Sequence, residues 1–400
     1  MQGLGSNKLF ISNPFEDYST NSDVVTSDGE LTLVFKSQLE KFISDTLLLL
    51  EEKYNSDEID RHDNSVYTGM SGVAFLYIKL YELGIKPDGL EIALKYVEKF
   101  LRSIKVRYIT FLCGDAGPLT IAAYLYYKLN KSDEFQMCIG HLLSAEEEAV
   151  KRSTADELLY GRVGYLYCLL WLNKKINPEP IPQNLIQRIV KCVITSGLNY
   201  ERKEQYLPLM YEWYQEQYVG AAHGLSGIVT LLLKSNFTDK ELMVQEIEGL
   251  CKLKYPSGNF FTLLQSEAKE ILHWCHGTPG FTFMFIEAYK KLGDEKYLNE
   301  AKLCADRIWE KGILKKGYGL CHGTAGNAYS LLAVYQASKD IKYLHRAAKF
   351  AEFCLSYGTH NCRIPDRPYS LFEGMGGTLY FLVDFLKNYE NAKFPCFDDI

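Results

Sequence analysis

The sequence lacks the features that would direct a chain into a membrane or out of the cell. Its first ten residues, MQGLGSNKLF, contain no basic start followed by an apolar run, so no secretory signal is expected. The second residue is glutamine, so the N-terminal myristoylation pattern is missing. Nowhere do 18 uncharged apolar residues follow one another, so no transmembrane segment is expected either.

Positive charge is in short supply, and the number of cysteines is odd. The chain has 44 Lys and Arg against 50 Asp and Glu, a net charge of -6, and an acidic surface repels the phosphates of nucleic acid. Nucleic acid is therefore not expected as a partner. Eleven scattered cysteines in a long chain without a signal favour reduced thiols, a metal site or catalysis over a disulfide framework. These features together predict a cytoplasmic protein.

What the sequence does contain is an internal repeat. A Gly-x-x-Gly pair followed by an apolar run occurs seven times, for example in YTGMSGVAFLY and in CHGTAGNAYSLLAVY. One such pair means little because glycine is common, but seven copies, 45 to 63 residues apart, indicate a repeated helical hairpin with its loops. The first glycines of the seven pairs are Gly69, Gly114, Gly161, Gly224, Gly277, Gly323 and Gly374.

Two kinds of helix alternate along this repeat. The runs after the glycines are apolar nearly all round, as in AYLYY or YLYCLLWL, which is typical of helices buried on most sides. Between them lie amphipathic stretches, such as residues 90–104 and 297–310, whose apolar positions recur at helical spacing. Buried inner helices and amphipathic outer helices predict an all-α fold, an α/α toroid of seven helical hairpins in two concentric rings.

We expect a single toroid domain over residues 1–400, because no convincing linker interrupts the repeat, with an N-terminal arm over about residues 1–30. The longest spacing, between the third and fourth copies, predicts an insertion around residues 200–220. Each glycine pair stands where a loop enters an inner helix. Glycine at such a point permits a positive φ and a close approach of backbones.

The residues just before the glycines carry the chemistry. Equivalent positions in a ring of repeats lie at the same end of the toroid, so four of the seven copies direct a His or a Glu to one central mouth, and two of those four also bring a Cys. The residues directly before the first glycines are Thr68, Cys113, Tyr160, His223, His276, His322 and Glu373.

Two cysteines stand in the same position of adjacent repeats and are therefore expected to be neighbours. A lone Cys275 or Cys321 would more often be a buried, inert thiol, whereas a duplicated Cys-His-Gly at matching positions favours a metal. Two thiolates and an imidazole suit zinc and leave a fourth position open, as in catalytic zinc sites. A further thiol would bind there as a nucleophilic thiolate. The register alone leaves either His276 or His322 as the third ligand.

With these motifs the sequence resembles the lanthionine synthetase C-like family, specifically its eukaryotic cytosolic members, over nearly the whole chain. The resemblance implies a double-ring α/α toroid with zinc at its centre. It also implies that the zinc ligands are Cys275, Cys321 and His322, which decides between the two histidines. The motifs that carry the resemblance are WCHG, GYGLCHGTAGNAY, SLFEGMGG, ITFLCGDAGPL and LMYEWYQEQYVGAAHG.

The resemblance implies an activity as well. Bacterial relatives cyclise peptides by adding cysteine thiols to dehydroalanine or dehydrobutyrine, whereas eukaryotic relatives bind glutathione and add it to dehydroamino acids in proteins such as damaged kinases. The histidine of the family's A-H-G motif is His223 here, which would stabilise the enolate and protonate the α-carbon. Its acidic partner would be Asp156 or Glu157. Arg162 is a further cation near the mouth without an assigned role.

Two other cations match positions where eukaryotic relatives hold glutathione. The charges of Lys316 and Arg363 suit the carboxylates of glutathione, and an arginine can bind a carboxylate through two parallel hydrogen bonds. Ile364, Pro365 and Asp366 share the loop of Arg363 and would add contacts. The arginine that bacterial cyclases carry shortly before the WC motif is missing from EILHWCHG, which counts against peptide cyclisation.

The leading hypothesis is a zinc-dependent glutathione transferase acting on dehydroamino-acid residues. A non-catalytic glutathione-binding adaptor or sensor is the alternative, and the presence of His223 favours the enzyme because binding alone needs no acid/base group. An α/α-toroid glycosidase would need two carboxylates across a sugar bond, for which Glu373 and Asp115 are available. That third hypothesis leaves both Cys-His-Gly copies unexplained.

Overall fold

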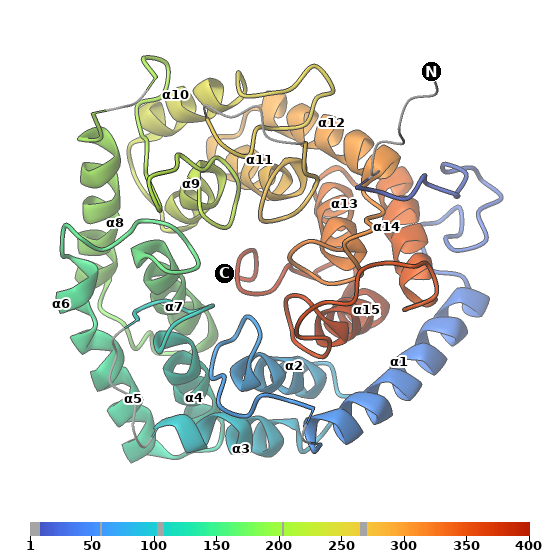
Figure 1. Ribbon diagram of the computed structural model, residues 1–400, viewed down its shortest axis with the longest axis horizontal. Coiled ribbons are helices and arrows are strands. Elements are labelled where there is room, and N and C mark those ends of the chain that lie inside the picture. The colour runs from blue at the N-terminus through green and yellow to red at the C-terminus, as the bar shows by residue number, and fades with distance from the viewer. Residues whose placement is uncertain (1–8, 57, 102–107, 202–203, 265–269) are drawn as a thin grey trace, which may run out of the picture.

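The computed structural model describes residues 9–56, 58–101, 108–201, 204–264 and 270–400. Within these residues every regular element is a helix, and fourteen of the fifteen helices form two concentric rings (Figure 1). Helix α1 packs against α15, so the two ends of the helical sequence close the ring. The predicted all-α toroid with seven inner and seven outer helices is confirmed.

The inner ring is the product of the glycine repeat. Each inner helix begins one or two residues after the first glycine of a pair. The inner helices are α2 (Met70–Glu82), α4 (Ala116–Lys128), α7 (Arg162–Lys175), α9 (Leu225–Lys234), α11 (Thr278–Leu292), α13 (Thr324–Ser338) and α15 (Met375–Asn388). In α4 every residue from Ala116 to Tyr126 is buried, which is why its sequence is apolar all round.

The outer ring has one apolar face and one charged face. In α12, for example, Leu298, Ala301 and Ala305 are buried toward the inner ring at helical spacing. The outer helices are α1 (Leu33–Tyr54), α3 (Gly89–Leu101), α5 (Ser132–Ser144), α8 (Gln183–Leu198), α10 (Lys240–Leu250), α12 (Glu295–Lys311) and α14 (Ile341–Cys354). The expected outer helices over 90–104 and 297–310 are α3 and α12, and residues 102–104 lie outside the described residues. A short helix, α6 (Glu146–Ala149), follows α5.

The glycines are needed mainly because backbones approach closely, and not because of a positive φ. Among the first glycines of the pairs only Gly277 has a positive φ, of 99°. At the second glycine of all seven pairs, an added Cβ would lie 1.8 to 2.5 Å from the carbonyl oxygen six residues earlier. The tightest case is Gly326, whose Cβ would lie 1.8 Å from the carbonyl oxygen of Leu320. The loop before each inner helix therefore folds back against the first turn of that helix, which fixes the position of the residues before the glycines.

The centre of the toroid is occupied by the segment that follows α15 (Figure 1). The ring of Phe394 stacks on Trp274 with centroids 4.9 Å apart, and Phe397 meets the same indole edge-on at 5.4 Å. The ammonium of Lys234, which is almost fully buried, donates to Asp398 Oδ1 at 3.1 Å and lies 3.4 Å from Glu287. A buried charge of this kind is tolerated because it is paired and hydrogen-bonded.

Two segments lie outside the rings. The described residues before α1 run along the outer ring, where Asp17 pairs with Arg346 of α14 at 2.6 Å. Residues 1–8 of the predicted N-terminal arm lie outside the described residues. Between the end of α8 and the start of α9, where an insertion is predicted, the described residues form no helix, and Trp213 and Glu216 pair there as a short hairpin.

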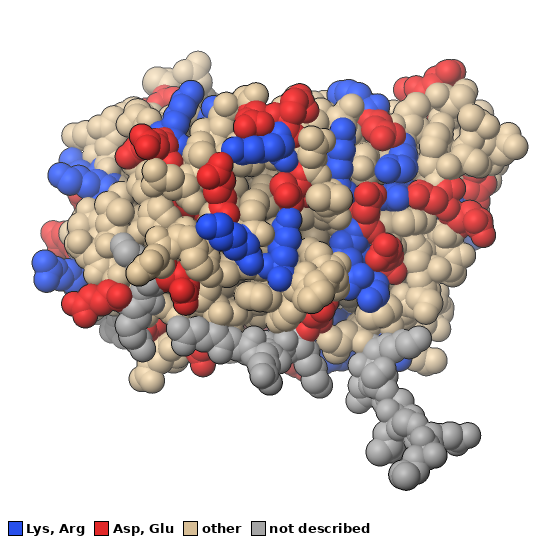
Figure 2. All heavy atoms as spheres, turned by 90° about the horizontal axis from the view of Figure 1, so that it is seen from above, with Lys and Arg blue, Asp and Glu red and all other residues tan. Residues whose placement is uncertain are grey.

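The surface carries charges of both signs side by side. On the face shown in Figure 2, positive and negative side chains are interspersed, and ion pairs such as Lys296 with Glu248, at 3.0 Å, join neighbouring outer helices. Each exposed pair of this kind adds no more than about 1 kcal/mol to stability. None of the helices in the described residues is long and apolar enough to cross a membrane.

Candidate metal and acid/base site

Two cysteines and one histidine converge where α11 and α13 begin. One ligand atom from each of Cys275, Cys321 and His322 lies within 4.8 Å of the other two. The segments are held together by a hydrogen bond from the backbone N–H of Cys275 to the carbonyl of Cys321, at 3.4 Å. Both cysteines are buried and His322 is only slightly exposed. The adjacency expected from matching repeat positions is therefore present.

The second histidine of the duplicated motif lies elsewhere. His276 belongs to none of the metal-competent clusters among the described residues, and its ring lies 5.8 Å from Tyr218 and 6.1 Å from His223. Burial, reinforced by the charge of His223, lowers the pKa of His276 to about 4, so this imidazole stays neutral at physiological pH. Of the two histidines that the register leaves open, the structure brings His322 and not His276 next to the two cysteines.

The chemistry of the three donors fits a divalent cation. Burial, together with the neighbouring thiol of Cys275, raises the pKa of Cys321 well above its usual value. Burial alone would lower the pKa of His322, but its interaction with Cys321 and the charge of Glu373 outweigh the burial and raise the pKa. The ligand atoms of a tetrahedral zinc site lie about 3.5–3.8 Å apart, so a small adjustment would close the cluster around the ion. The described donors leave the fourth position to an external ligand.

Two further groups border the cluster. Tyr67 stacks on Phe372 with centroids 5.0 Å apart, and burial together with the thiols of Cys321 and Cys275 raises the pKa of its hydroxyl. Glu373 has a carboxylate oxygen 3.9 Å from His322 Nε2. Tyr67 was not among the expected site residues, although the sequence contains the signal for it. It stands two residues before its glycine, which is the repeat position that Cys275 and Cys321 occupy.

His223 is held by a buried carboxylate. Its Nδ1 lies 2.7 Å from Glu157 Oε2, and the side chains of the two residues are 14% and 2% exposed. The carboxylate also accepts hydrogen bonds from the backbone N–H groups of Leu159, at 2.9 Å, and of Tyr160. An imidazole fixed through Nδ1 presents its other nitrogen, Nε2, for proton transfer. Glu157 is thus the acidic partner that the sequence left open.

The other candidate partner points away from His223. Asp156 lies 3.0 Å from Arg162 Nε and accepts a hydrogen bond from the hydroxyl of Ser196 at 2.6 Å. Arg162 also donates to the backbone carbonyls of Lys151 and Thr154. Burial raises the pKa of Asp156 to about 6 although the Arg162 charge opposes the shift. Arg162, a cation without an assigned role in the sequence, thus holds the loop before α7 in place.

The residues expected to bind glutathione lie on two adjacent segments. The backbone N–H of Arg363 donates to the carbonyl of Lys315 at 2.8 Å, which brings the loop of Arg363 next to Lys316. Burial lowers the pKa of His273, and the nearby charges of His322 and Lys316 add to this shift. The guanidinium of Arg363 lies 2.9 Å from both carboxylate oxygens of Asp366. Ile364 is 79% exposed, and Pro365 beside it is half-buried.

Trp213, which lies in one of the sequence motifs but had no role assigned to it, belongs to the site. The indole of Trp213 lies flat on the imidazole of His223, with centroids 4.0 Å apart and an interplanar angle of 4°. The two residues are ten positions apart, and Trp213 belongs to the segment between α8 and α9 that has no counterpart in the other repeats. The repeat therefore contained no signal for this contact.

Comparison with known proteins shows which family the chain belongs to. A sequence model of the family described as lanthionine synthetase C-like protein matches residues 60–398. A Danio rerio protein named glutathione S-transferase LANCL1 is 45% identical over 406 residues, which cover 98% of this chain and 100% of that protein. The chain therefore belongs to the lanthionine synthetase C-like family.

A solved structure shares the fold. A structure described as nisin cyclase matches with a TM-score of 0.66 at 16% sequence identity, covering 90% of this chain and 97% of the other. At this identity the match concerns the toroid and the order of its helices. The function has to be argued from the side chains at the mouth.

Proposed function

We propose that this protein is a zinc-dependent glutathione transferase that adds the thiolate of glutathione to dehydroalanine and dehydrobutyrine residues of proteins, among them damaged kinases. The observation that carries the proposal is the cluster of Cys275, Cys321 and His322 beside the pair of His223 and Glu157. The two are joined by a hydrogen bond from the backbone N–H of Ala222, next to His223, to the carbonyl of Cys275 at 3.3 Å. The activity named for the 45% identical relative supports the same class of reaction.

Zinc is the cofactor that suits the cluster, because two thiolates and an imidazole are preferred zinc ligands. When bound there, it would lower the pKa of a glutathione thiol so that the thiol is present as a thiolate near neutral pH. Cys275, Cys321 and His322 would hold the ion, and a coordination position not taken by these three residues would be available to the glutathione thiol. We place the activity in the cytoplasm, since all eleven cysteines are free thiols, as a reducing compartment requires.

His223 supplies the proton that completes the addition. A C–S bond forms at the β-carbon of the dehydroamino acid, and the electrons of its double bond move to the carbonyl and give an enolate. The imidazolium of His223, oriented by Glu157, donates its Nε2 proton to the α-carbon. The thiol proton is released to solvent before attack, so one thiol and one alkene give one thioether and no other product.

Glutathione is held by the positive charges beside the cluster. Lys316 and Arg363 lie on adjacent segments at the mouth, and the two carboxylates of glutathione match their two charges. A single nitrogen of Arg363, Nη2, donates to both carboxylate oxygens of Asp366, and a glutathione carboxylate would share or replace this contact. Ile364 and Pro365 border the same loop and add apolar contact.

The test uses a peptide with one dehydroalanine, glutathione and the zinc-loaded protein, and the glutathione adduct is measured by mass spectrometry. Rapid adduct formation that requires Cys321 and His223 is the expected result. A non-catalytic glutathione-binding adaptor would instead bind glutathione with the same residues and leave the peptide unchanged. If the adduct forms only at the uncatalysed rate while zinc and glutathione are bound, the transferase hypothesis is wrong and the adaptor hypothesis takes its place.

A further inference from the structure

The segment before α9 carries a strained hairpin next to the proton donor. Trp213 and Glu216 exchange two backbone hydrogen bonds, of 3.0 and 3.1 Å, around the central residues Tyr214 and Gln215. Both central residues are left-handed, with φ of 50° and 64°. Such two-residue turns normally contain Asn and Gly, because a residue with a bulky side chain is unfavourable at a positive φ. The hairpin thus retains a tyrosine where a smaller residue would be more stable, which points to a function for that side chain.

Three aromatic side chains lead from the proton donor to solvent. Trp213 covers one face of His223, and Tyr160 lies nearly parallel to the indole with centroids 5.4 Å apart. Tyr214 meets the edge of Trp213 at 4.5 Å and is itself 81% exposed, while Tyr160 is 48% exposed. We call Tyr160, Trp213 and Tyr214 the aromatic ledge. Large, rigid rings of this kind gain contact area with a partner at little conformational cost.

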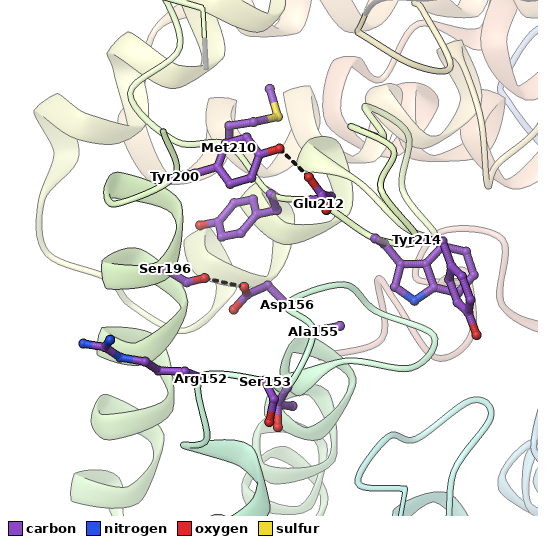
Figure 3. Close-up of a pocket in the computed structure, with 12 residues that line it drawn as sticks. Arg152, Ser153, Ala155, Asp156, Ser196, Tyr200, Met210, Glu212 and Tyr214 are labelled. Carbon is purple, nitrogen blue, oxygen red and sulfur yellow. Dashed lines mark hydrogen bonds between the residues drawn. The ribbon is translucent and has the colours of Figure 1, made fainter. Parts of the chain in front are cut away.

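A cavity of about 400 Å³ lies behind the hairpin, between it and the outer helix α8 (Figure 3). Its walls are the loop from Arg152 to Asp156, Ser196 of α8 and the segment from Met210 to Tyr214. The Ser196–Asp156 and Tyr200–Glu212 hydrogen bonds tie the walls together, as Figure 3 shows. The cavity shares two walls with the site, because Asp156 precedes the glutamate that holds His223 and Trp213 stacks on that histidine.

We propose that the aromatic ledge and this cavity bind the polypeptide on one side of the acceptor residue, so that the enzyme selects dehydroamino acids within a polypeptide chain over free small acceptors. This inference rests on the proposed transferase function. A dehydroalanine unit alone needs only the thiolate and His223, whereas Tyr214 is separated from that histidine by the ring of Trp213. An extended peptide advances about 3.3 Å per residue, so the residues next to the acceptor would lie along the ledge and place one side chain in the cavity.

The experiment compares two acceptors, N-acetyldehydroalanine methylamide and a ten-residue peptide with a central dehydroalanine. Tyr214→Ala is expected to lower kcat/KM for the peptide roughly tenfold and to change that for the small acceptor less than twofold, because only the peptide reaches the ledge. Tyr214→Phe, which keeps the ring, should restore most of the loss. Tyr81→Ala, at the other end of the toroid, is the matched control and should alter neither value.

A second variant separates the side chain from the shape of the turn. Tyr214→Asn with Gln215→Gly gives the preferred turn sequence, so the protein should become more stable while peptide kcat/KM falls as in Tyr214→Ala. The inference is overturned if this double variant or Tyr214→Ala uses the peptide at the parental rate, or if both acceptors lose activity equally. A parent protein that gives no adduct with either acceptor would instead contradict the proposed transferase function.

Discussion

At the scale of single residues, the candidate site consists of two neighbouring groups of side chains, a cluster of three residues and a hydrogen-bonded pair. In the proposed function, the cluster of Cys275, Cys321 and His322 would bind and activate the thiol, and the pair of His223 and Glu157 would transfer the proton. These groups come from separate loops, so their functions can be removed one at a time. The following variants use that separation.

One zinc ion is expected per chain. Cys321→Ser should abolish zinc binding, because two remaining ligands cannot complete a tetrahedral site, whereas Cys192→Ser on the outer helix α8 should retain it. Metal analysis by mass spectrometry gives the stoichiometry, and X-ray absorption should show zinc–sulfur distances of about 2.3 Å and zinc–nitrogen distances of about 2.0–2.1 Å. Full zinc content in Cys321→Ser would exclude this ligand set.

The proton-transfer function should be lost without loss of zinc. His223→Asn keeps a hydrogen-bonding group but donates no proton at neutral pH, so adduct formation should fall by about 10²–10⁴ with zinc and glutathione still bound. Glu157→Gln should also lower the rate of adduct formation, but by a smaller factor. This change disturbs the orientation and charge of the imidazole and leaves the imidazole itself in place. Exposed Glu147→Gln serves as the control. Parental rates in both active-site variants would mean that the proton comes from another group or from water.

Glutathione binding should depend on the charges beside the cluster. Losing one charge-assisted contact costs about 1.5–3 kcal/mol, so Lys316→Ala should raise the glutathione concentration for half-saturation roughly tenfold to a hundredfold. Arg363→Ala should raise this concentration by a factor at the low end of the range, because the arginine side chain is 46% exposed and solvent screens its charge. Lys315→Ala, at the exposed neighbouring position, is the control for a general change of charge. An unchanged saturation curve in both variants would remove these residues from the glutathione site.

At the scale of the elements, the loops that carry the ligands are pressed against the first turns of the inner helices. Gly326→Ala would place a Cβ 1.8 Å from the carbonyl oxygen of Leu320, directly before Cys321. We expect it to lower the free energy of unfolding by more than about 3 kcal/mol and to disturb zinc binding. Gly140→Ala, in the exposed middle of α5 with no atom within 4 Å of the added Cβ, should instead raise it by about 0.5–1 kcal/mol. Chemical denaturation measures both, and a neutral Gly326→Ala would show that the loop adjusts freely.

At the scale of the whole molecule, the buried charges at the centre of the rings make stability depend on pH. Burial alone would raise the pKa of Asp398, but the charges of Lys234, Lys393 and Lys290 outweigh it and lower the pKa to about 2. Because the pKa in the folded protein is below the value of about 3.8 in the unfolded chain, this stabilisation is complete above pH 3.8 and is lost as the pH falls toward 2.

The size of this effect is about 2 kcal/mol, from a shift of nearly two pKa units. Asp398→Asn should therefore be less stable than the parent at neutral pH, and the difference should shrink as the pH falls below 4. Asp28→Asn, on an exposed turn, is the control, and its stability should depend on pH as that of the parent does. Unfolding by urea at several pH values measures the difference in free energy of unfolding between Asp398→Asn and the parent. A difference that stays constant down to pH 2 would contradict the assignment of a charged Asp398.

The sequence by itself determined the repeat and much of the site. Seven glycine pairs predicted seven inner helices. Only glycine fits at the second position of each pair, because a Cβ there would lie 1.8 to 2.5 Å from a carbonyl oxygen of the preceding loop. That register also placed Cys275 and Cys321 side by side, since equivalent positions of adjacent repeats are neighbours in a ring. It held a signal for Tyr67 too, in the same position of the first repeat.

Only the tertiary structure decided what the register does not encode. Glu157 faces His223 while adjacent Asp156 faces Arg162, and the sequence alone does not say which of the two neighbouring carboxylates turns toward the histidine. The stack of Trp213 on His223 depends on a hairpin whose turn residues, Tyr214 and Gln215, lack the Asn-Gly signature of such turns. Contacts between segments with no counterpart in other repeats are fixed by packing in three dimensions, and the periodicity of the sequence carries no information about them.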